Sequence, residues 1–196
     1  MRPDSGNSHG GFCPPWRTLL LAVLCSLLFM IAGPAPDTLV YTQGSYSSFL
    51  SGHWVHSDLE HALWNIGALI ILGYLFEPIL KQRLFTIMLS ASLLLSLWLR
   101  LFAPELTAYC GLSGILNALL VTGTLSLWQQ HRSSIYLLIL LLTAIKNITE
   151  ILSQHALFTH SAWPSFPQAH IAGMLIGVIL FLVGLRVNSQ RCHETI

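Results

Sequence analysis

Six long apolar runs, separated by shorter polar stretches, dominate the pattern of hydrophobic and polar positions along this chain. A helix needs about 20 apolar residues to cross about 30 Å of hydrocarbon, and each run comes near that length. The pattern therefore predicts an all-α, polytopic membrane protein with six membrane-spanning helices. The predicted spans lie near residues 16–33, 59–77, 84–102, 112–128, 134–152 and 168–186.

Two of the connections between these runs are long and polar, and the others are short. Residues 34–58 are rich in Gly, Ser and Tyr, and residues 153–167 form the second long loop. We expect a single membrane domain over residues 16–186. The remaining residues, 1–15 and 187–196, are expected to form an N-terminal and a C-terminal tail.

The first apolar run has about the length of a secretory signal peptide as well as that of a membrane helix. However, Pro36 follows Ala35, which is unfavourable for cleavage, and five more apolar runs come after it. We therefore expect a retained first membrane helix.

The composition favours the same class of protein. The chain is 54% hydrophobic and only 9% charged, whereas a soluble domain carries about 25% charged residues. A formal net charge of +1 gives no indication of nucleic-acid binding, so the expected partner is the lipid bilayer. The four cysteines show no paired spacing, which predicts neither a disulfide framework nor a zinc site. They are Cys13, Cys25, Cys110 and Cys192.

Positive charge predicts the orientation of the spans. Lys and Arg cluster in the two tails and in the second and fourth loops, while the two long loops contain none. Cytoplasmic loops carry an excess of these residues, so both termini are predicted to be cytoplasmic. The first, third and fifth loops then face outward. The cations concerned are Arg2, Arg17, Lys81, Arg83, Arg132, Arg186 and Arg191, with Arg100 at the other face.

A serine and a histidine are predicted to share one depth near the outer face. Ser113 opens the fourth span between Gly111 and Gly114, and His170 opens the sixth. A serine hydroxyl becomes a good nucleophile when a histidine takes its proton. The first turn of a helix also offers unpaired N–H groups and a positive dipole end to an oxyanion. The alternative is that Ser113 caps its helix and His170 is an interfacial histidine, but the shared depth favours a catalytic dyad.

His61 and Asn65 form a second polar group at the same predicted depth. Their i, i+4 spacing puts both on one face of the second span, and polar side chains in a membrane face protein or a water-filled cavity. Both can donate a hydrogen bond to an oxyanion; the alternative is a hydrogen bond that packs two helices. His56 lies nearer the start of the span and is a candidate for support.

The histidines in and before the second span could also be considered as metal ligands. His53, His56, Asp58 and His61 match no standard zinc spacing. We therefore expect no metal ion and no cofactor.

Two further pairs have helical spacing. Gly173 and Gly177 form a G-x-x-x-G motif, which lets helices approach closely, and we expect it to hold the sixth span against the fourth. Lys146 and Glu150 are spaced i, i+4 in the fifth span. They are expected either to form a buried ion pair that positions the helix or to contact a substrate.

Three motifs in the predicted spans resemble those of the rhomboid family of intramembrane serine proteases. Each falls in the corresponding span and in the family's order, so the resemblance covers the second to the sixth span. The motifs are His56-x4-His61-x3-Asn65, Gly111-x-Ser113-Gly114 and Ala169-His170-x2-Gly173.

The resemblance implies a rhomboid-like bundle in which Ser113 is the nucleophile and His170 the base. It also implies an oxyanion hole formed by His61, Asn65 and the backbone N–H of Ser113. The remaining residues of the motifs and the residue four positions after the serine would support these groups. They are His56, Gly111, Gly114, Asn117 and Gly173.

Two features depart from the family pattern. Many rhomboids carry a tyrosine four residues after the serine, stacked on the catalytic histidine, where this chain has Asn117. Support for His170 must therefore come from elsewhere or be weaker. Many rhomboids also have a Trp-Arg pair in the first loop, where this chain has Ser-Gly-His-Trp at residues 51–54.

The compact size and three local features are similar to the rhombosortase subgroup. That similarity implies a serine endopeptidase in the bacterial inner membrane whose active site opens to the periplasm. Its substrates would be membrane-anchored proteins with a C-terminal Gly-Gly signal, an apolar helix and a basic tail. The alternative is an inactive rhomboid-like protein that binds membrane clients, which the presence of Ser113 and His170 disfavours. The three features are the run 109–114, the segment 61–65 and the Lys146/Glu150 pair.

Overall fold

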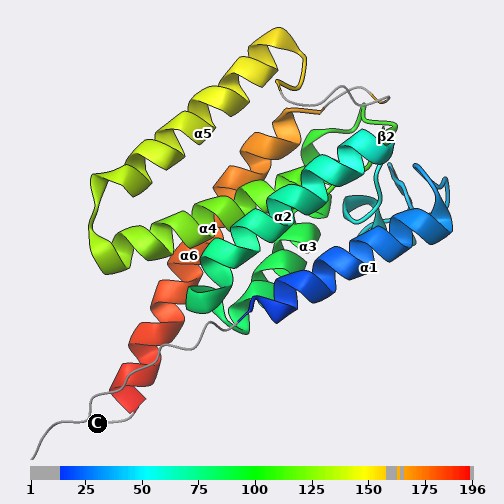
Figure 1. Ribbon diagram of the computed structural model, residues 1–196. Helices are drawn as coiled ribbons and strands as arrows, with labels where there is room; N and C mark the ends of the chain where they lie inside the picture. The colour runs from blue at the N-terminus through cyan, green and yellow to red at the C-terminus, as the bar shows by residue number, and fades with distance from the viewer. Residues whose placement is uncertain (1–13, 158–162, 164–165, 195–196) are drawn as a thin grey trace, which may run out of the picture.

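A computed structural model describes residues 14–157, 163 and 166–194, with side chains as far as residue 184. The predicted N-terminal tail therefore lies largely outside the described part, as do the side chains of the predicted C-terminal tail and that of Cys13. Six helices are present in the described residues, and each coincides with a predicted span (Figure 1). They are α1 (Trp16–Ala32), α2 (Leu59–Leu80), α3 (Arg83–Phe102), α4 (Ser113–His131), α5 (Ser134–Ser153) and α6 (Gln168–Glu194).

The end of α6 differs from the prediction, because the helix continues to Glu194 instead of ending at residue 186. The prediction followed the last apolar residues, and these mark the hydrophobic thickness that a helix can cross. The hydrogen bonds of a helix do not need an apolar environment, so the backbone continues past that limit.

Three helices of the described chain are long and apolar enough to cross a membrane, namely α2, α3 and α5. The segments Trp16–Ala32 and Gln168–Gly184 are apolar but shorter. α4 lies in the interior, where it contacts α2, α3, α5 and α6 (Figure 1). A helix enclosed by other helices needs no apolar face toward lipid. The chain is a helical membrane bundle, while the six-span topology and its orientation stay predictions.

The closest helix contact joins α4 and α6 through small residues. A Cβ atom on Gly173 would collide with the carbonyl oxygen of Gly114, and one on Gly177 would lie 2.6 Å from the carbonyl oxygen of Ala118. Thr122 donates its hydroxyl to the carbonyl of Gly177 at 3.0 Å. This is the packing predicted from the G-x-x-x-G motif, and it brings the first turns of the two helices together.

The first long loop contains structure that the all-α prediction missed. Strand β1 (Tyr41–Thr42) pairs antiparallel with β2 (Ala108–Tyr109), and a short 3-10 helix η1 (Ser51–His53) follows β1. The sequence pattern could not predict this pair of two-residue strands, because the whole of α2 and α3 lies between them in the chain. The amide of Gly111 donates to the carbonyl of Gly52 at 3.0 Å, so this loop supports the segment that precedes Ser113.

A buried histidine holds the first loop on α3. His53 is fully buried, and its Nε2 lies 2.7 Å from Oγ of Ser96. The Ser96 hydroxyl donates to the carbonyl of Phe49, so Nε2 of His53 carries the hydrogen. Burial lowers the pKa of His53 to about 4, which keeps the ring neutral at physiological pH.

A buried glutamate ties α1 to α2 at the other end of the molecule. Glu77 is 4% exposed. Its carboxylate accepts from the amide of Thr18 at 2.8 Å, from the hydroxyl of Thr18 at 2.7 Å and from the amide of Arg17 at 3.0 Å. Gly73 makes room for Thr18, because a Cβ there would collide with the threonine side chain. The carboxylate thus satisfies N–H groups in the first turn of α1, which have no partner within the helix.

Candidate active site

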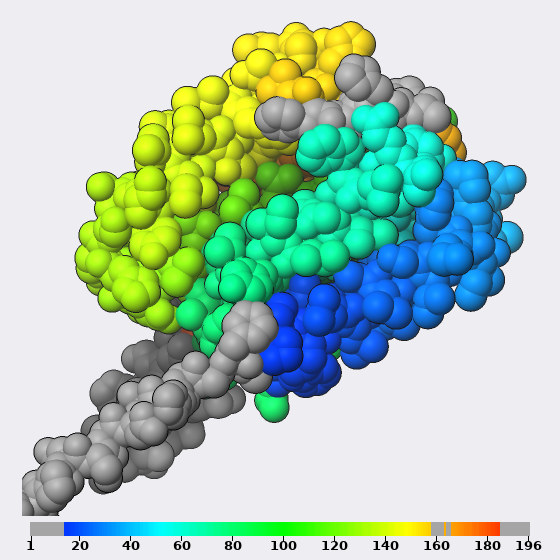
Figure 2. Space-filling model, in the orientation of Figure 1, coloured from blue at the N-terminus to red at the C-terminus, as the bar shows by residue number. Residues whose placement is uncertain are grey.

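A cleft of about 920 Å³ runs between α2 and α5, with α4 at its floor. Figure 2 shows it as the hollow between the cyan helix and the yellow helix. Apolar side chains such as Ile71 of α2 and Leu142 of α5 line its length, and polar side chains gather at one end. These polar residues come from four different helices. They are His61, Asn65, Ser113, Asn117, Lys146, Glu150 and His170.

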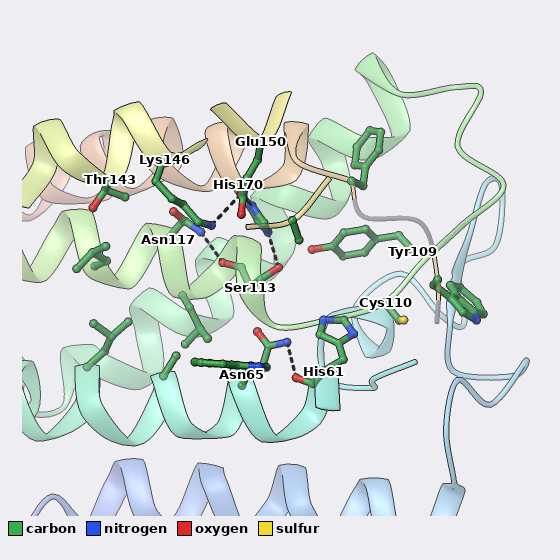
Figure 3. Close-up of a pocket in the computed structure, with 18 of the residues that line it drawn as sticks. His61, Asn65, Tyr109, Cys110, Ser113, Asn117, Thr143, Lys146, Glu150 and His170 are labelled. Atoms are coloured by element: carbon green, nitrogen blue, oxygen red, sulfur yellow. Dashed lines mark hydrogen bonds and ion pairs between the residues drawn. The ribbon is translucent and has the colours of Figure 1, made fainter. Parts of the chain in front are cut away.

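Ser113 and His170 meet at the polar end of the cleft. Oγ of Ser113 lies 2.9 Å from Nε2 of His170 (Figure 3). Ser113 is the first residue of α4, and the residue that precedes it, Leu112, makes no side-chain cap. The alternative in which Ser113 caps its helix is therefore wrong, because its hydroxyl bonds to the histidine. The hydroxyl lies beside the N–H groups of the first turn, which a helix leaves without internal acceptors.

The other ring nitrogen of His170 contacts a carboxylate. Nδ1 lies 2.9 Å from Oε2 of Glu150, which is 1% exposed. An ionised carboxylate can only accept, so Nδ1 carries the hydrogen and Nε2 offers its lone pair to the hydroxyl of Ser113. This is the tautomer that a general base needs.

Glu150 has two further donors. Lys146 donates from Nζ to Oε2 at 2.8 Å, which is the ion pair that the i, i+4 spacing predicted. The amide of Leu157, in the loop after α5, donates to Oε1 at 3.0 Å. The contact with His170 was missed by sequence reasoning. Two signals pointed to it: Glu150 lies near the outer end of its predicted span, and Asn117 leaves the histidine without its usual aromatic support.

His61 and Asn65 line the cleft beside Ser113, as the i, i+4 spacing predicted (Figure 3). Asn65 donates one amide N–H to the carbonyl of His61 at 3.0 Å, within its own helix. An amide nitrogen carries two hydrogens, so a second donor remains for a ligand. Nδ1 of His61 lies 3.0 Å from Oγ of Ser57, which also bonds to Asp58. Because the Ser57 hydroxyl donates its hydrogen to the Asp58 carboxylate, its Oγ accepts from Nδ1 of His61. In the neutral ring Nε2 then carries the lone pair, so His61 can donate to an oxyanion from Nε2 only when both ring nitrogens carry a hydrogen.

The ring of His61 is held between Gly111 and His56. Gly111 has a φ of +120°, which favours glycine, and a Cβ there would lie 2.6 Å from Nε2 of His61. His56 is fully buried, and its ring meets that of His61 edge-on, with 5.2 Å between centroids. Burial lowers the pKa of His56 to about 3, so its ring is neutral at physiological pH. His56 lies behind His61 and supports it from outside the cleft.

Asn117 occupies the position one turn after Ser113. It donates from Nδ2 to the carbonyl of Ser113 at 2.9 Å and accepts from Asn147 of α5 at 2.9 Å. Its side chain therefore joins α4 to α5. Among the described residues, its hydrogen bonds go to these two partners, and the side-chain partners of His170 are Ser113 and Glu150.

Two other chemistries were considered for this cleft. Cys110 lines it, but burial raises the pKa of its thiol to about 12, and the thiolate is the nucleophilic form. Within the described residues, no group of three or more His, Cys, Asp or Glu side chains is placed to hold a metal ion. Ser113 is thus the side chain in the cleft that has a base within hydrogen-bond distance.

A comparison with protein families matches the Rhomboid domain to residues 43–187, which is 145 of the 196 residues. The match begins after α1 and includes every residue that lines the cleft. A search of curated proteins found no match to the chain. With about three quarters of its length matched, the chain belongs to the rhomboid family, whose members are typically intramembrane serine proteases.

Proposed function

We propose that this protein is an intramembrane serine endopeptidase in which Ser113 is the nucleophile and His170 the general base. The observation that carries the proposal is the 2.9 Å hydrogen bond between Oγ of Ser113 and Nε2 of His170. It lies at the polar end of a cleft whose length is apolar. The apolar side chains along the cleft match the apolar surface of a membrane-embedded substrate helix.

The chemistry follows from the positions of these groups. Nε2 of His170 takes the hydroxyl proton as Oγ of Ser113 attacks the peptide carbonyl, and it returns that proton to the leaving amine. An acyl-enzyme forms on Ser113. The developing oxyanion is stabilised by Asn65 and the backbone N–H of Ser113, and by His61 when both nitrogens of its ring carry a hydrogen. One such donor contributes about 10²–10³ in kcat. Water then hydrolyses the acyl-enzyme, or an amine accepts the acyl group in a transfer reaction.

The cleft between α2 and α5 supports lateral access of the substrate from the bilayer. A peptide bond within a helix hides its carbonyl from attack, so the top of the substrate helix has to unwind. Gly in a helix interior costs about 1 kcal/mol relative to Ala, so a Gly-Gly pair lowers the cost of unwinding.

The substrates proposed are exported proteins anchored by a C-terminal Gly-Gly signal, an apolar helix and a basic tail. The support for this class is the similarity to rhombosortases at residues 61–65 and 109–114 and at the Lys146/Glu150 pair. The charge distribution supports a bacterial inner membrane location with both termini in the cytoplasm. The active site would then open to the periplasm.

The test is cleavage of a Gly-Gly-tailed substrate by detergent-purified protein and by its Ser113→Ala and His170→Ala variants. Both variants are expected to accumulate and to lose cleavage, and a fluorophosphonate probe is expected to label the wild type but not Ser113→Ala. Persistent cleavage by either variant would overturn the dyad. A wild-type protein that takes no label and cleaves nothing, yet co-purifies with membrane proteins, would establish the client-binding alternative.

A further inference from the structure

We propose that Glu150 is a positioning residue for catalysis, so that the protein works with a Ser113–His170–Glu150 triad. This inference rests on the proposed function and adds a third residue to it. The three side chains come from α4, α6 and α5, and two hydrogen bonds of 2.9 Å connect them in a line (Figure 3). Glu150 touches the base and not the reacting atoms, so its effect is exerted through His170.

The first role of Glu150 is to select one tautomer of His170. Because Oε2 accepts, the hydrogen of the neutral ring is held on Nδ1 and the lone pair of Nε2 points at Ser113. The proton of Ser113 moves to Nε2 during attack, while the hydrogen on Nδ1 stays in place. The carboxylate remains ionised throughout and stabilises the imidazolium that forms.

The second role is electrostatic. The side chain of His170 is 12% exposed and that of Glu150 only 2% exposed, so little water screens the pair. In such surroundings a carboxylate at hydrogen-bond distance stabilises a new positive charge far more than it would in water. A dyad without an acid would have to form that charge unaided.

The contacts argue against Glu150 serving only to neutralise Lys146. The Lys146 side chain is 29% exposed, whereas that of Glu150 is 2% exposed and turned against a different helix. An i, i+4 ion pair requires neither the contact with His170 nor the bond from the Leu157 amide to Oε1. Lys146 and Leu157 together leave the carboxylate ionised and restrict its rotamer, which orients Oε2 toward the ring.

Asn117 explains why the triad is needed. In the family pattern an aromatic ring at this position supports the histidine, but Asn117 bonds to the Ser113 carbonyl and to Asn147. Glu150 approaches the ring of His170 at Nδ1 and supplies the support that the asparagine does not.

The central experiment measures steady-state cleavage by Glu150→Gln. We expect kcat to fall by about 10²–10⁴ with KM changed less than threefold, because the loss falls on the base and not on substrate binding. The acid limb of the pH–rate profile is expected to move to lower pH, since the imidazolium loses its anionic neighbour. Fluorophosphonate labelling of Ser113 should slow in proportion. The same change in an exposed loop, Glu105→Gln, is the matched control and is expected to behave as wild type.

A double variant shows whether Glu150 acts on His170 or only neutralises the charge of Lys146. Glu150→Gln leaves Lys146 without its carboxylate, whereas Lys146→Met with Glu150→Gln replaces the pair by neutral groups. We expect the double variant to be as slow as Glu150→Gln and Lys146→Met alone to stay within about tenfold of wild type. Recovery of activity in the double variant would show that Glu150 only neutralises Lys146, and it would overturn the inference.

A measurement on the unmodified protein keeps the inference testable if the variants do not fold. 15N NMR of histidine-labelled protein at neutral pH should show the His170 ring with its hydrogen on Nδ1; a hydrogen on Nε2 overturns the inference. Cleavage by Ser113→Ala would refute the proposed function itself. Loss of cleavage in Ser113→Ala, together with Glu150→Gln within threefold of wild type, would refute the triad alone and leave the dyad.

Discussion

Glu77 of α2 and Glu150 of α5 are both buried glutamates in membrane helices, and each has a cation beside it. Glu77 is 4% exposed and accepts from Thr18 and Arg17, whereas Glu150 is 1% exposed and accepts from Lys146, Leu157 and His170. The difference lies in what the partners can do. The amides, the hydroxyl and the guanidinium around Glu77 keep one charge state, while the ring of His170 can gain a proton.

The contrast between the two glutamates lies in whether a partner changes its charge during the proposed reaction. Glu77 lies outside the cleft and accepts hydrogen bonds from the first turn of α1. It therefore contributes to the stability of the folded protein and not to the reaction. Glu150 lines the cleft, and its electrostatic attraction to His170 increases when the ring becomes positively charged. Burial and ion pairing by themselves do not distinguish the two.

The largest expected effect comes from exchanging each carboxylate for an amide. Glu150→Gln is expected to raise the activation barrier by about 3–5 kcal/mol. Glu77→Gln is expected to lower the free energy of unfolding by about 3 kcal/mol and leave kcat unchanged, because a buried carboxylate loses charge-assisted hydrogen bonds. Thermal unfolding in detergent gives the stability, and fluorophosphonate titration gives turnover per active molecule. A fall in kcat for Glu77→Gln as large as that for Glu150→Gln would erase the distinction.

The next largest effect is expected at the contact between α4 and α6. It shows whether the close packing of these helices sets the distance from Ser113 to His170. In Gly173→Ala the new methyl group meets the Gly114 carbonyl, so the two helices have to separate. A displacement of about 1 Å costs about 10² in rate, or close to 3 kcal/mol. Gly184→Ala is the matched control on the same helix, because a Cβ there meets nothing within 4 Å. Equal turnover in both variants would show that the packing does not position the dyad.

Sequence patterns predicted the depth of most residues but not the direction in which their side chains face. The apolar runs placed all six helices, and the motifs placed Ser113, His170, His61 and Asn65 at one level. The contact of Glu150 with His170 was not predicted, because it depends on the rotation of α5 about its own axis. That rotation follows from packing against α4 and α6, which no local pattern contains.

The same reason explains what was missed elsewhere. Glu77 and Thr18 are 59 residues apart in the chain and meet because Gly73 admits the threonine. β1 and β2 pair across α2 and α3, so neither strand has a local signature. The role of Asp58 as the N-cap of α2, by contrast, could have been predicted, because an aspartate directly before an apolar run is typical of a helix start. Its carboxylate accepts from the amide of His61 at 2.8 Å.

The third effect concerns His53, a buried histidine whose own charge does not change in the proposed reaction. The pKa of His53 is about 4 in the folded protein, below the ordinary value of 6.5, because the ring is buried. Below pH 6.5 the unfolded chain binds a proton that the folded protein excludes, so stability falls as the pH drops toward 4. The slope is at most about 1.4 kcal/mol per pH unit, or about 2 kcal/mol between pH 6.5 and 5.

Unfolding followed at pH 7.5, 6.5, 5.8 and 5.0 measures this slope. His53→Gln is expected to flatten it, and His155→Gln, at an exposed position, is expected to leave it unchanged. His56 contributes in the same direction, since burial lowers its pKa to about 3, so some slope remains in His53→Gln. Identical slopes in wild type and His53→Gln would show that the loop does not stay buried in solution.

The smallest effect concerns Ser57. It contacts Nδ1 of His61, as Glu150 contacts Nδ1 of His170, but it carries no charge. Ser57→Ala removes the hydroxyl oxygen that accepts from Nδ1 of His61 at 3.0 Å, so the orientation of the His61 ring beside Ser113 is less restricted. We expect kcat to fall about fivefold, near 1 kcal/mol, with KM unchanged, because the oxyanion forms only after the substrate has bound. Ser47→Ala, in the exposed part of the same loop, is the matched control. A loss in Ser57→Ala as large as that in Glu150→Gln would mean that a neutral support contributes as much as a charged one, and the contrast between the two ring partners would fail.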